Sequence, residues 1–133
     1  MSKEIDRTWN RKATVSFTFC ALAGFVIWFA SVQLTGHREP WDDDSGFYFW
    51  YLLGAGALAG IVVPRHFWAC PLGIYVGQAV AMLTLLQFGS MAPLGLLVAL
   101  PIMSVISLVG WCVGAAIHLL IAKAHSRFSQ ASE

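Results

Sequence analysis

The position of the charges is the strongest constraint on how this chain folds. Asp, Glu, Lys and Arg make up 11% of the 133 residues, and all of them lie outside four apolar segments, at 13–34, 46–63, 67–88 and 95–122. A soluble domain normally carries about 25% charged residues. Each segment is close to the roughly 20 residues that a helix needs to cross a bilayer. The sequence therefore predicts an all-α integral membrane protein, a single domain built as a four-helix transmembrane bundle.

The first apolar segment begins after a basic stretch, as a secretory signal peptide does. A signal peptide has an apolar core of about 7–15 residues, and this segment is longer. We therefore interpret 13–34 as an uncleaved first span. The net charge of +1 argues against nucleic-acid binding, which normally needs a concentrated basic face, so no nucleic-acid partner is expected.

Basic side chains are distributed unevenly between the two sides of the predicted bundle. Four spans put residues 1–12, the turn at 64–66 and residues 123–133 on one side, and these segments hold seven of the eight Lys and Arg residues. The loop at 35–45 holds only Arg38 and is acidic. The positive-inside rule then places both termini in the cytoplasm and the loop outside, which is the arrangement expected in a bacterial cytoplasmic (inner) membrane. The short turn at 64–66 also predicts that the second and third helices pack as antiparallel neighbours.

Glycine spacing predicts how the helices pack. Small residues four apart allow two helix backbones to approach closely within a membrane. Three GxxxG pairs have this spacing, and further glycines align with them by depth. The predicted helix-packing glycines are Gly24, Gly54, Gly56, Gly60, Gly73, Gly77, Gly110 and Gly114. In the first span, Ser16, Cys20 and Gly24 form a similar stripe. Because four helices do not easily bury three such faces among themselves, we expect at least one face to meet a helix of a partner protein.

Few polar side chains fall near the predicted membrane midplane. Gln78, Thr84 and Ser104 are the candidates for a polar midplane site, with Gln78 the most polar at that depth. No Asp, Glu, Lys or Arg lies within a span, which argues against a proton-coupled or cation-coupled transporter built around a central carboxylate. No nucleophile has a base beside it in sequence, and no glycine-rich nucleotide loop is present. The sequence therefore predicts no enzyme activity.

The extracytoplasmic side combines acidic and aromatic residues. The residues that we assign to a possible outer docking surface are Trp41, Asp42, Asp43, Asp44, Tyr48 and Trp50. Aromatic anchors flanked by charge are typical of interfaces. The simpler interpretation is that the aspartates are solvated and favour the positive end of the helix that follows, with Asp44 or Ser45 as its cap.

Two histidines and three cysteines have alternative interpretations. His66 and His118 both lie toward the cytoplasmic side, where two histidines on neighbouring helices would be able to hold a b-type haem. We expect no cofactor, because one histidine lies in a turn and the other within a helix. Cys20, Cys70 and Cys112 form no CxxC pair and are interpreted as buried small apolar residues.

The leading functional hypothesis is a small non-enzymatic membrane subunit that packs through GxxxG faces into a larger assembly, in a structural or accessory role. Its expected partners are the lipid bilayer and other membrane subunits or further copies of itself. The alternative is a homo-oligomeric channel or transporter for a small neutral or anionic solute, with the polar midplane residues along its path.

Overall fold

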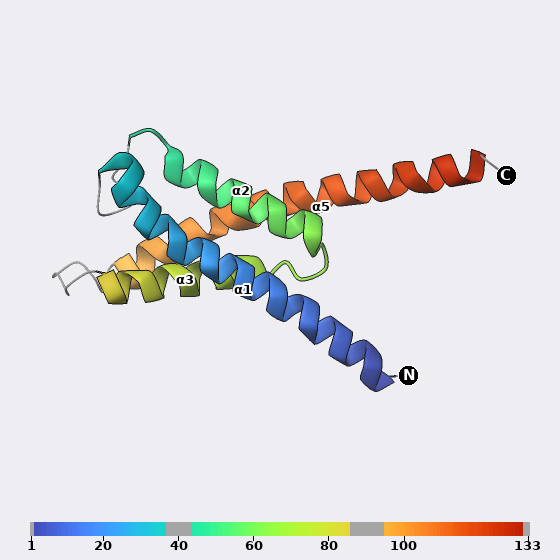
Figure 1. Ribbon diagram of the computed structural model, residues 1–133, viewed down its shortest axis with the longest axis horizontal. Helices are drawn as coiled ribbons and strands as arrows, with labels where there is room; N and C mark the ends of the chain where they lie inside the picture. The colour runs from blue at the N-terminus through green and yellow to red at the C-terminus, as the bar shows by residue number, and fades with distance from the viewer. Residues whose placement is uncertain (1, 37–43, 86–94, 132–133) are drawn as a thin grey trace.

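The computed structural model describes residues 2–36, 44–85 and 95–131, and its regular elements in these ranges are all helical (Figure 1). The elements in chain order are α1 (Ser2–Thr35), α2 (Phe47–Val62), α3 (Ala69–Leu85), the short π-helix η2 (Gly95–Ala99) and α5 (Leu100–Ala131). The predictions of an all-α fold and of four long helices are confirmed.

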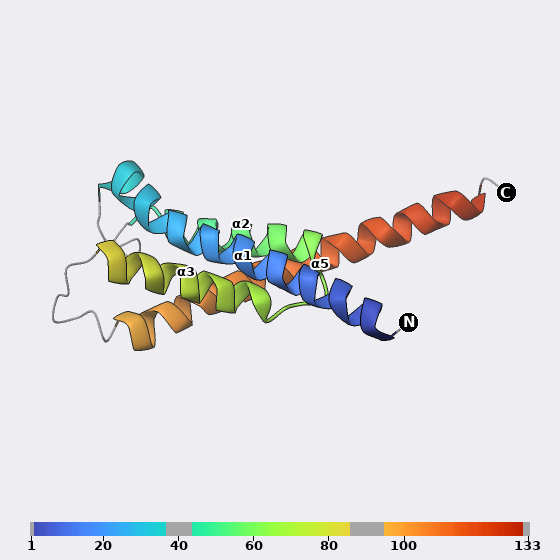
Figure 2. The same cartoon turned by 60° about the horizontal axis from the view of Figure 1, so that its bottom comes forward.

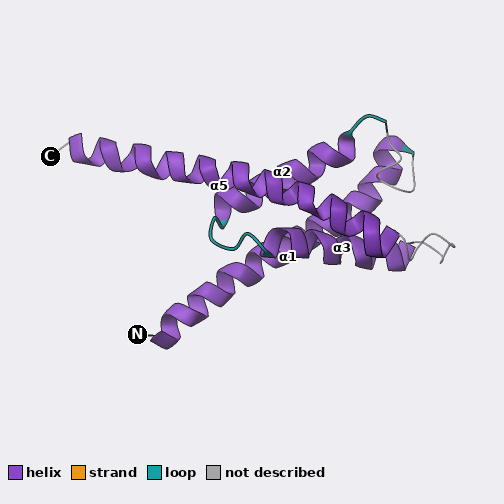
Figure 3. Ribbon diagram, turned by 180° about the vertical axis from the view of Figure 1, so that it is seen from behind, coloured by secondary structure: helices purple, strands orange, loops and turns teal. Residues whose placement is uncertain are grey.

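The outer helices are longer than the predicted spans. Residues 2–12 and 123–131, which the sequence assigns to polar tails, continue α1 and α5 as helix. Both extensions project from the same end of the bundle, the end that also holds the connection between α2 and α3 (Figures 1 and 3). The fold therefore places the two chain ends and this turn together at one end.

The helices pack as two pairs, and consecutive helices are not the main partners (Figure 2). α1 packs chiefly on α3, and α2 packs chiefly on α5. Contacts of α3 with α5 and of α1 with α2 join the pairs, whereas α2 and α3 barely touch. The prediction that the turn at 64–66 makes α2 and α3 packing neighbours is wrong. Each of these helices instead has a glycine-matched partner elsewhere in the chain.

Glycine brings α2 and α5 into backbone contact. The four glycines of the two GxxxG motifs in this pair each face a carbonyl of the opposite helix: Gly56 faces Ser107, Gly60 Trp111, Gly110 Leu53 and Gly114 Ala57. A Cβ atom at any of these glycines would overlap the carbonyl oxygen that it faces. The contact is reciprocal, because both helices supply glycine and both supply carbonyl groups. The sequence GxxxG thus sets how closely these two helices approach.

The contact between α1 and α3 is built on the same principle. Gly73 faces the carbonyl of Phe17, Gly77 that of Ala21, and Gly24 that of Ile74. Around them, the small-residue stripe of α1 is buried, with Cys20 fully enclosed. The third GxxxG motif therefore also meets a helix of its own chain.

Gly54 differs from the other predicted packing glycines. It is exposed, and a Cβ atom there would have no other atom within 4 Å. The prediction that Gly54 is a packing residue is wrong, because Gly54 lies on a face of α2 that no described helix covers. The expectation that one GxxxG face is left for a partner helix also fails, since all three motifs meet backbone within this chain.

Side-chain hydrogen bonds to backbone carbonyls tie the helices together. The Tyr51 hydroxyl donates to the Ala23 carbonyl over 3.0 Å and so links α2 to α1. The Trp111 indole donates to the Val63 carbonyl over 3.3 Å, which fixes the end of α2 against α5. Such bonds give partners to hydroxyl and indole donors, which are costly to bury without one.

The start of the fourth span is irregular where the sequence contains Pro101. The π-helical turn η2 ends at Ala99, two residues before this proline. Proline lacks the N–H of a regular helical hydrogen bond, and a widened turn accommodates it. The Ser104 hydroxyl donates to the Leu100 carbonyl over 2.7 Å, so it supports the first turn of α5.

Two neighbouring glycines of α2 provide a matched test of this packing. We expect Gly56→Ala to lower the free energy of unfolding by about 1–3 kcal/mol, because its Cβ would collide with α5 backbone. Gly54→Ala meets open space and is expected to be neutral or stabilising by up to about 1 kcal/mol, since Ala is the better helix former. Reversible unfolding in mixed micelles measures both variants, and equal losses would contradict the packing described here.

Candidate functional site

The apolar core of the bundle also encloses several polar side chains. Ser31, Gln78 and Ser107 are fully buried, and His66 is 1% exposed. Large apolar side chains instead cover the outward faces, with Trp50 and Val62 more than 70% exposed. Polar side chains are mostly exposed in folded proteins, so a buried polar side chain is the informative exception. The buried polar residues are therefore the first place to look for a functional site.

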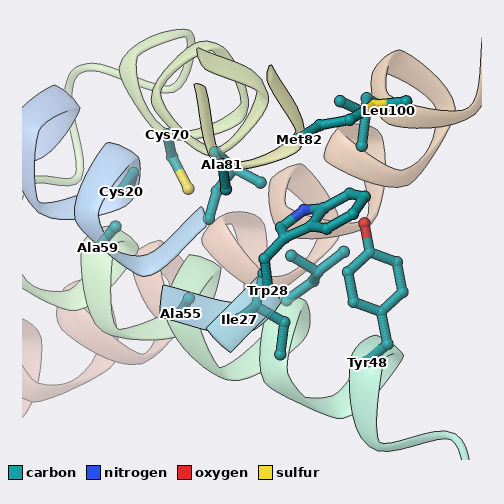
Figure 4. Close-up of a cluster of buried hydrophobic side chains, with 12 residues drawn as sticks. Cys20, Ile27, Trp28, Tyr48, Ala55, Ala59, Cys70, Ala81, Met82 and Leu100 are labelled. Atoms are coloured by element: carbon teal, nitrogen blue, oxygen red, sulfur yellow. The ribbon is translucent and has the colours of Figure 1, made fainter. Parts of the chain in front are cut away.

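Tyr48 and Gln78 form the central polar pair. Tyr48 lies in the first turn of α2 and Gln78 near the middle of α3, and both side chains are buried. The Tyr48 hydroxyl donates to Gln78 Oε1. Figure 4 places the Tyr48 hydroxyl beside the indole of Trp28, which comes from α1. Three helices thus meet around this hydrogen bond, which joins two helices that otherwise barely contact each other.

The local structure at the start of α2 directs Tyr48 inward. Gly46 has a φ of 70°, a left-handed conformation that suits glycine and turns the chain into the helix. The Ser45 hydroxyl oxygen accepts from the backbone N–H of Phe47 over 3.2 Å, and the Trp50 N–H donates to the Gly46 carbonyl over 3.2 Å. This arrangement points Tyr48 into the bundle and Trp50 away from it.

Gln78 retains unused hydrogen-bonding capacity. Its Nε2 atom is buried and has no hydrogen-bond partner among the residues that the structure describes. An amide nitrogen carries two donors, and leaving them unmet inside a protein is costly. Gly77 explains how the amide comes to be enclosed, because its contact with Ala21 brings α1 and α3 together beside it.

The three predicted midplane residues do not form one site. Gln78 bonds across the bundle to Tyr48, whereas Ser104 donates to the Leu100 carbonyl of its own helix. Thr84 is exposed and donates to the carbonyls of Val80 and Ala81 within α3. No hydrogen bond joins any two of the three in the described part of the chain. The prediction that Thr84 belongs to a polar midplane site is wrong, because this residue faces outward.

The predicted outer docking surface is also altered. Asp44 and Trp50 are exposed, while residues 41–43, which include Trp41, Asp42 and Asp43, lie outside the described residues. Tyr48 is 1% exposed and belongs to the interior, so its assignment to a docking surface is wrong. A run of consecutive aromatic residues does not by itself reveal which ring faces inward.

Cysteines 20 and 70 meet between α1 and α3. Both are fully buried in one core cluster (Figure 4), and the Cys70 thiol donates to the Ser107 carbonyl over 4.0 Å. The prediction that the cysteines are buried is confirmed for Cys20 and Cys70. It is wrong for Cys112, which is exposed on α5.

The two histidines occupy different surroundings. His66 lies buried in the turn between α2 and α3, and the half-buried His118 lies on α5. His118 Nδ1 is 2.8 Å from the Ile61 carbonyl oxygen. Because a carbonyl only accepts, Nδ1 carries a hydrogen and donates it, so His118 joins α5 to the end of α2. Among the described residues, no three His, Cys, Asp or Glu side chains gather as a metal site would require.

Comparison with known proteins adds no function. The chain matches no protein-family model, and no curated protein or solved structure is significantly similar to it. The chemistry of the site therefore has to be argued from the geometry alone.

A double-mutant cycle tests the Tyr48–Gln78 pair. Tyr48→Phe removes the donor to the buried Gln78 oxygen, and we expect a loss of about 1–3 kcal/mol in the free energy of unfolding. Combined with Gln78→Leu, the loss is expected to be smaller than the sum of the two single losses, by about 1 kcal/mol.

Tyr51→Phe is the matched control for this cycle, because its hydroxyl bonds the Ala23 carbonyl and not Gln78. Its effect is expected to add to that of Gln78→Leu within about 0.5 kcal/mol. Purely additive effects for Tyr48→Phe and Gln78→Leu would mean that the two side chains do not act as a pair.

Proposed function

We propose that this chain is a small non-enzymatic membrane subunit that assembles with another membrane protein. The observation that carries the proposal is the exposed end of α5. Every described side chain from Leu119 to Arg127 is exposed, and the helix continues to Ala131. Thirteen residues of helix past His118 span about 20 Å. An isolated protein has no evident use for such an extension.

Membrane embedding is supported by the distribution of apolar surface. Two stretches, Arg11–Thr35 and Gly95–Arg127, are long and apolar enough to cross a membrane. α2 and α3 are shorter, at 16 and 17 residues, and a bilayer can adapt to such a mismatch by local thinning. Large apolar side chains are exposed on all four long helices. So much exposed apolar surface is rare on a soluble monomer.

Orientation is the next part of the proposal. Arg11, Lys12, Arg65, Lys123 and Arg127 all belong to the end of the bundle from which the two extensions project (Figure 1). The positive-inside rule favours this end in the cytoplasm, as in a bacterial inner membrane. The extension of α5 then reaches into or beyond the cytoplasmic interface.

Cysteine labelling tests the orientation. In a Cys112→Ser background, we expect a membrane-impermeant maleimide to label Ser45→Cys in intact cells. Ser126→Cys is expected to react only after the membrane is opened, because it lies at the basic end. Both native serines are exposed, and Cys20 and Cys70 are buried. The reverse labelling pattern, or equal labelling of both positions, would contradict the proposed topology.

The chemistry of the extension favours a protein partner. Leu119, Leu120 and Ile121 are consecutive apolar residues, each more than 60% exposed, and they directly follow His118, whose ring bonds the Ile61 carbonyl. Lys123 and Arg127 follow on the same helix. Apolar anchors with a charged border are typical of interface cores and rims. Since the GxxxG faces are used within the chain, this extension replaces them as the proposed contact.

Purification in mild detergent from membranes of the source organism tests the partner contact. We expect a second chain at fixed stoichiometry, and at least about tenfold weaker retention of it by the Leu119→Ala/Leu120→Ala variant, because two leucines would lose their burial. Val105→Ala/Val109→Ala is the control, since these exposed residues lie on the spanning part of α5. Isolated monomer from the wild-type chain, or equal retention by both variants, would overturn the proposal.

The alternative of a homo-oligomeric channel or transporter receives less support. A path for a small neutral or anionic solute would need Gln78, Thr84 and Ser104 on one wetted surface. Gln78 and Ser104 are enclosed, and Thr84 faces outward with its hydroxyl bonded to its own helix. No arrangement of these residues favours this candidate over an accessory subunit.

A further inference from the structure

A groove runs between α1 and α2 at the basic end of the bundle. Its walls are Val15 and Phe19 from α1 and Leu58 and Val62 from α2, and its volume is about 140 Å³. Ser16 and Ala59, which are both 3% exposed, also line it. The four wall side chains are 45–71% exposed, so the groove opens on the outside of the bundle. The contact between α1 and α2 is less close than the contacts within the two pairs, because no glycine of either helix faces the backbone of the other.

The groove is suited to a flexible apolar chain. No charged side chain lines it, and its only polar lining residue is the buried Ser16. Once the bundle is embedded in a bilayer, an outward-facing apolar groove is in contact with lipid. A groove of this volume is smaller than a site that encloses a whole ligand, so it suits a segment of one acyl chain whose remainder lies in the bilayer.

Cationic side chains border one end of this groove. Arg11 and Lys12 precede Val15 and Ser16 by one helical turn, so each is on the same face of α1 as a groove residue. Arg65 follows Val63, the last groove residue of α2, with only Pro64 between them. All three cations are exposed. An anionic amphiphile would place its charged headgroup at the basic rim and its apolar chain in the groove.

We infer that the groove and its basic rim form a binding site for an anionic glycerophospholipid of the cytoplasmic leaflet. One acyl chain lies between Val15 and Val62, and the phosphate lies at the level of Lys12 and Arg65. Basic pockets between membrane helices on the cytoplasmic side bind such headgroups. The inference rests on the proposed membrane embedding and orientation, but it does not depend on the proposed protein partner.

Native mass spectrometry of the purified full chain tests this site. The probe is an equimolar mixture of phosphatidylglycerol and phosphatidylcholine with identical acyl chains, added to the protein in detergent. We expect the wild-type chain to retain phosphatidylglycerol in preference. In Lys12→Gln/Arg65→Gln, the ratio of the two bound lipids should fall roughly twenty-five-fold, about fivefold for each charge removed.

Two further variants separate the headgroup from the acyl chain. Val62→Trp fills the groove from an exposed position and is expected to reduce binding of both lipids, while Val113→Trp, exposed on α5 outside the groove, should have no effect. Lys123→Gln/Arg127→Gln removes the same charge from the α5 extension and should leave the lipid ratio unchanged. Circular dichroism checks that each variant is folded.

Three results would overturn the inference. They are equal retention of the two lipids by the wild-type chain, an equal fall in the ratio for the Lys123/Arg127 control, and unchanged lipid binding by Val62→Trp. Because the measurement uses the isolated chain, none of these results depends on whether α5 binds a partner. If only the partner proposal fails, this protein will purify without a second chain but will still bind the lipid.

Discussion

The structure depends on contacts between glycine and backbone carbonyl groups across two helix pairs. Seven glycines of α1, α2, α3 and α5 face carbonyls of a neighbouring helix, and none of these positions has room for a Cβ atom. Between helices in a lipid bilayer there is no hydrophobic driving force, so close packing and weak Cα–H···O contacts have to provide the attraction. Glycine permits both. The two pairs, α1 with α3 and α2 with α5, follow from where glycine occurs.

Close packing of the pairs has consequences for the rest of the molecule. It encloses polar groups, including Gln78 and the thiols of Cys20 and Cys70, within an otherwise apolar chain. It also exhausts the small-residue faces, so a partner has to be met by other surfaces. The surfaces that remain are the apolar outer faces, the groove between α1 and α2, and the end of α5 beyond His118. Our functional proposals use the last two.

The sequence predicted the helices well and their partners poorly. Charge-free runs identify four long helices because the physical signal, a long apolar segment, is local to each run. Which helices pair is not local. Gly54 and Gly56 are equally plausible packing residues by spacing, yet only Gly56 faces α5. The turn at 64–66 suggested that α2 packs on α3, but backbone fit to α5 outweighs proximity along the chain.

The sequence predicted only part of the candidate site, and the part that was missed again depends on how the helices pack. Gln78 was singled out because an amide at that depth is unusual, and the structure encloses it. Its partner Tyr48 was assigned to the outer surface, since a run of aromatic residues at a helix entry carries no signal of which ring turns inward. The left-handed Gly46 decides that direction, and only the fold reveals it. Helix ends were also misjudged, because polar residues can continue a helix beyond its apolar segment.

Solid-state NMR of the chain in lipid bilayers tests the central claim most directly. With ¹³C labels on glycine Cα and on the carbonyls of serine and alanine, the account predicts cross-peaks between Gly56 and Ser107 and between Gly77 and Ala21. These pairs are far apart in sequence and meet only if α2 packs on α5 and α1 packs on α3. Absence of both cross-peaks, in spectra that resolve contacts within each helix, would contradict the glycine-to-carbonyl packing on which the account is built.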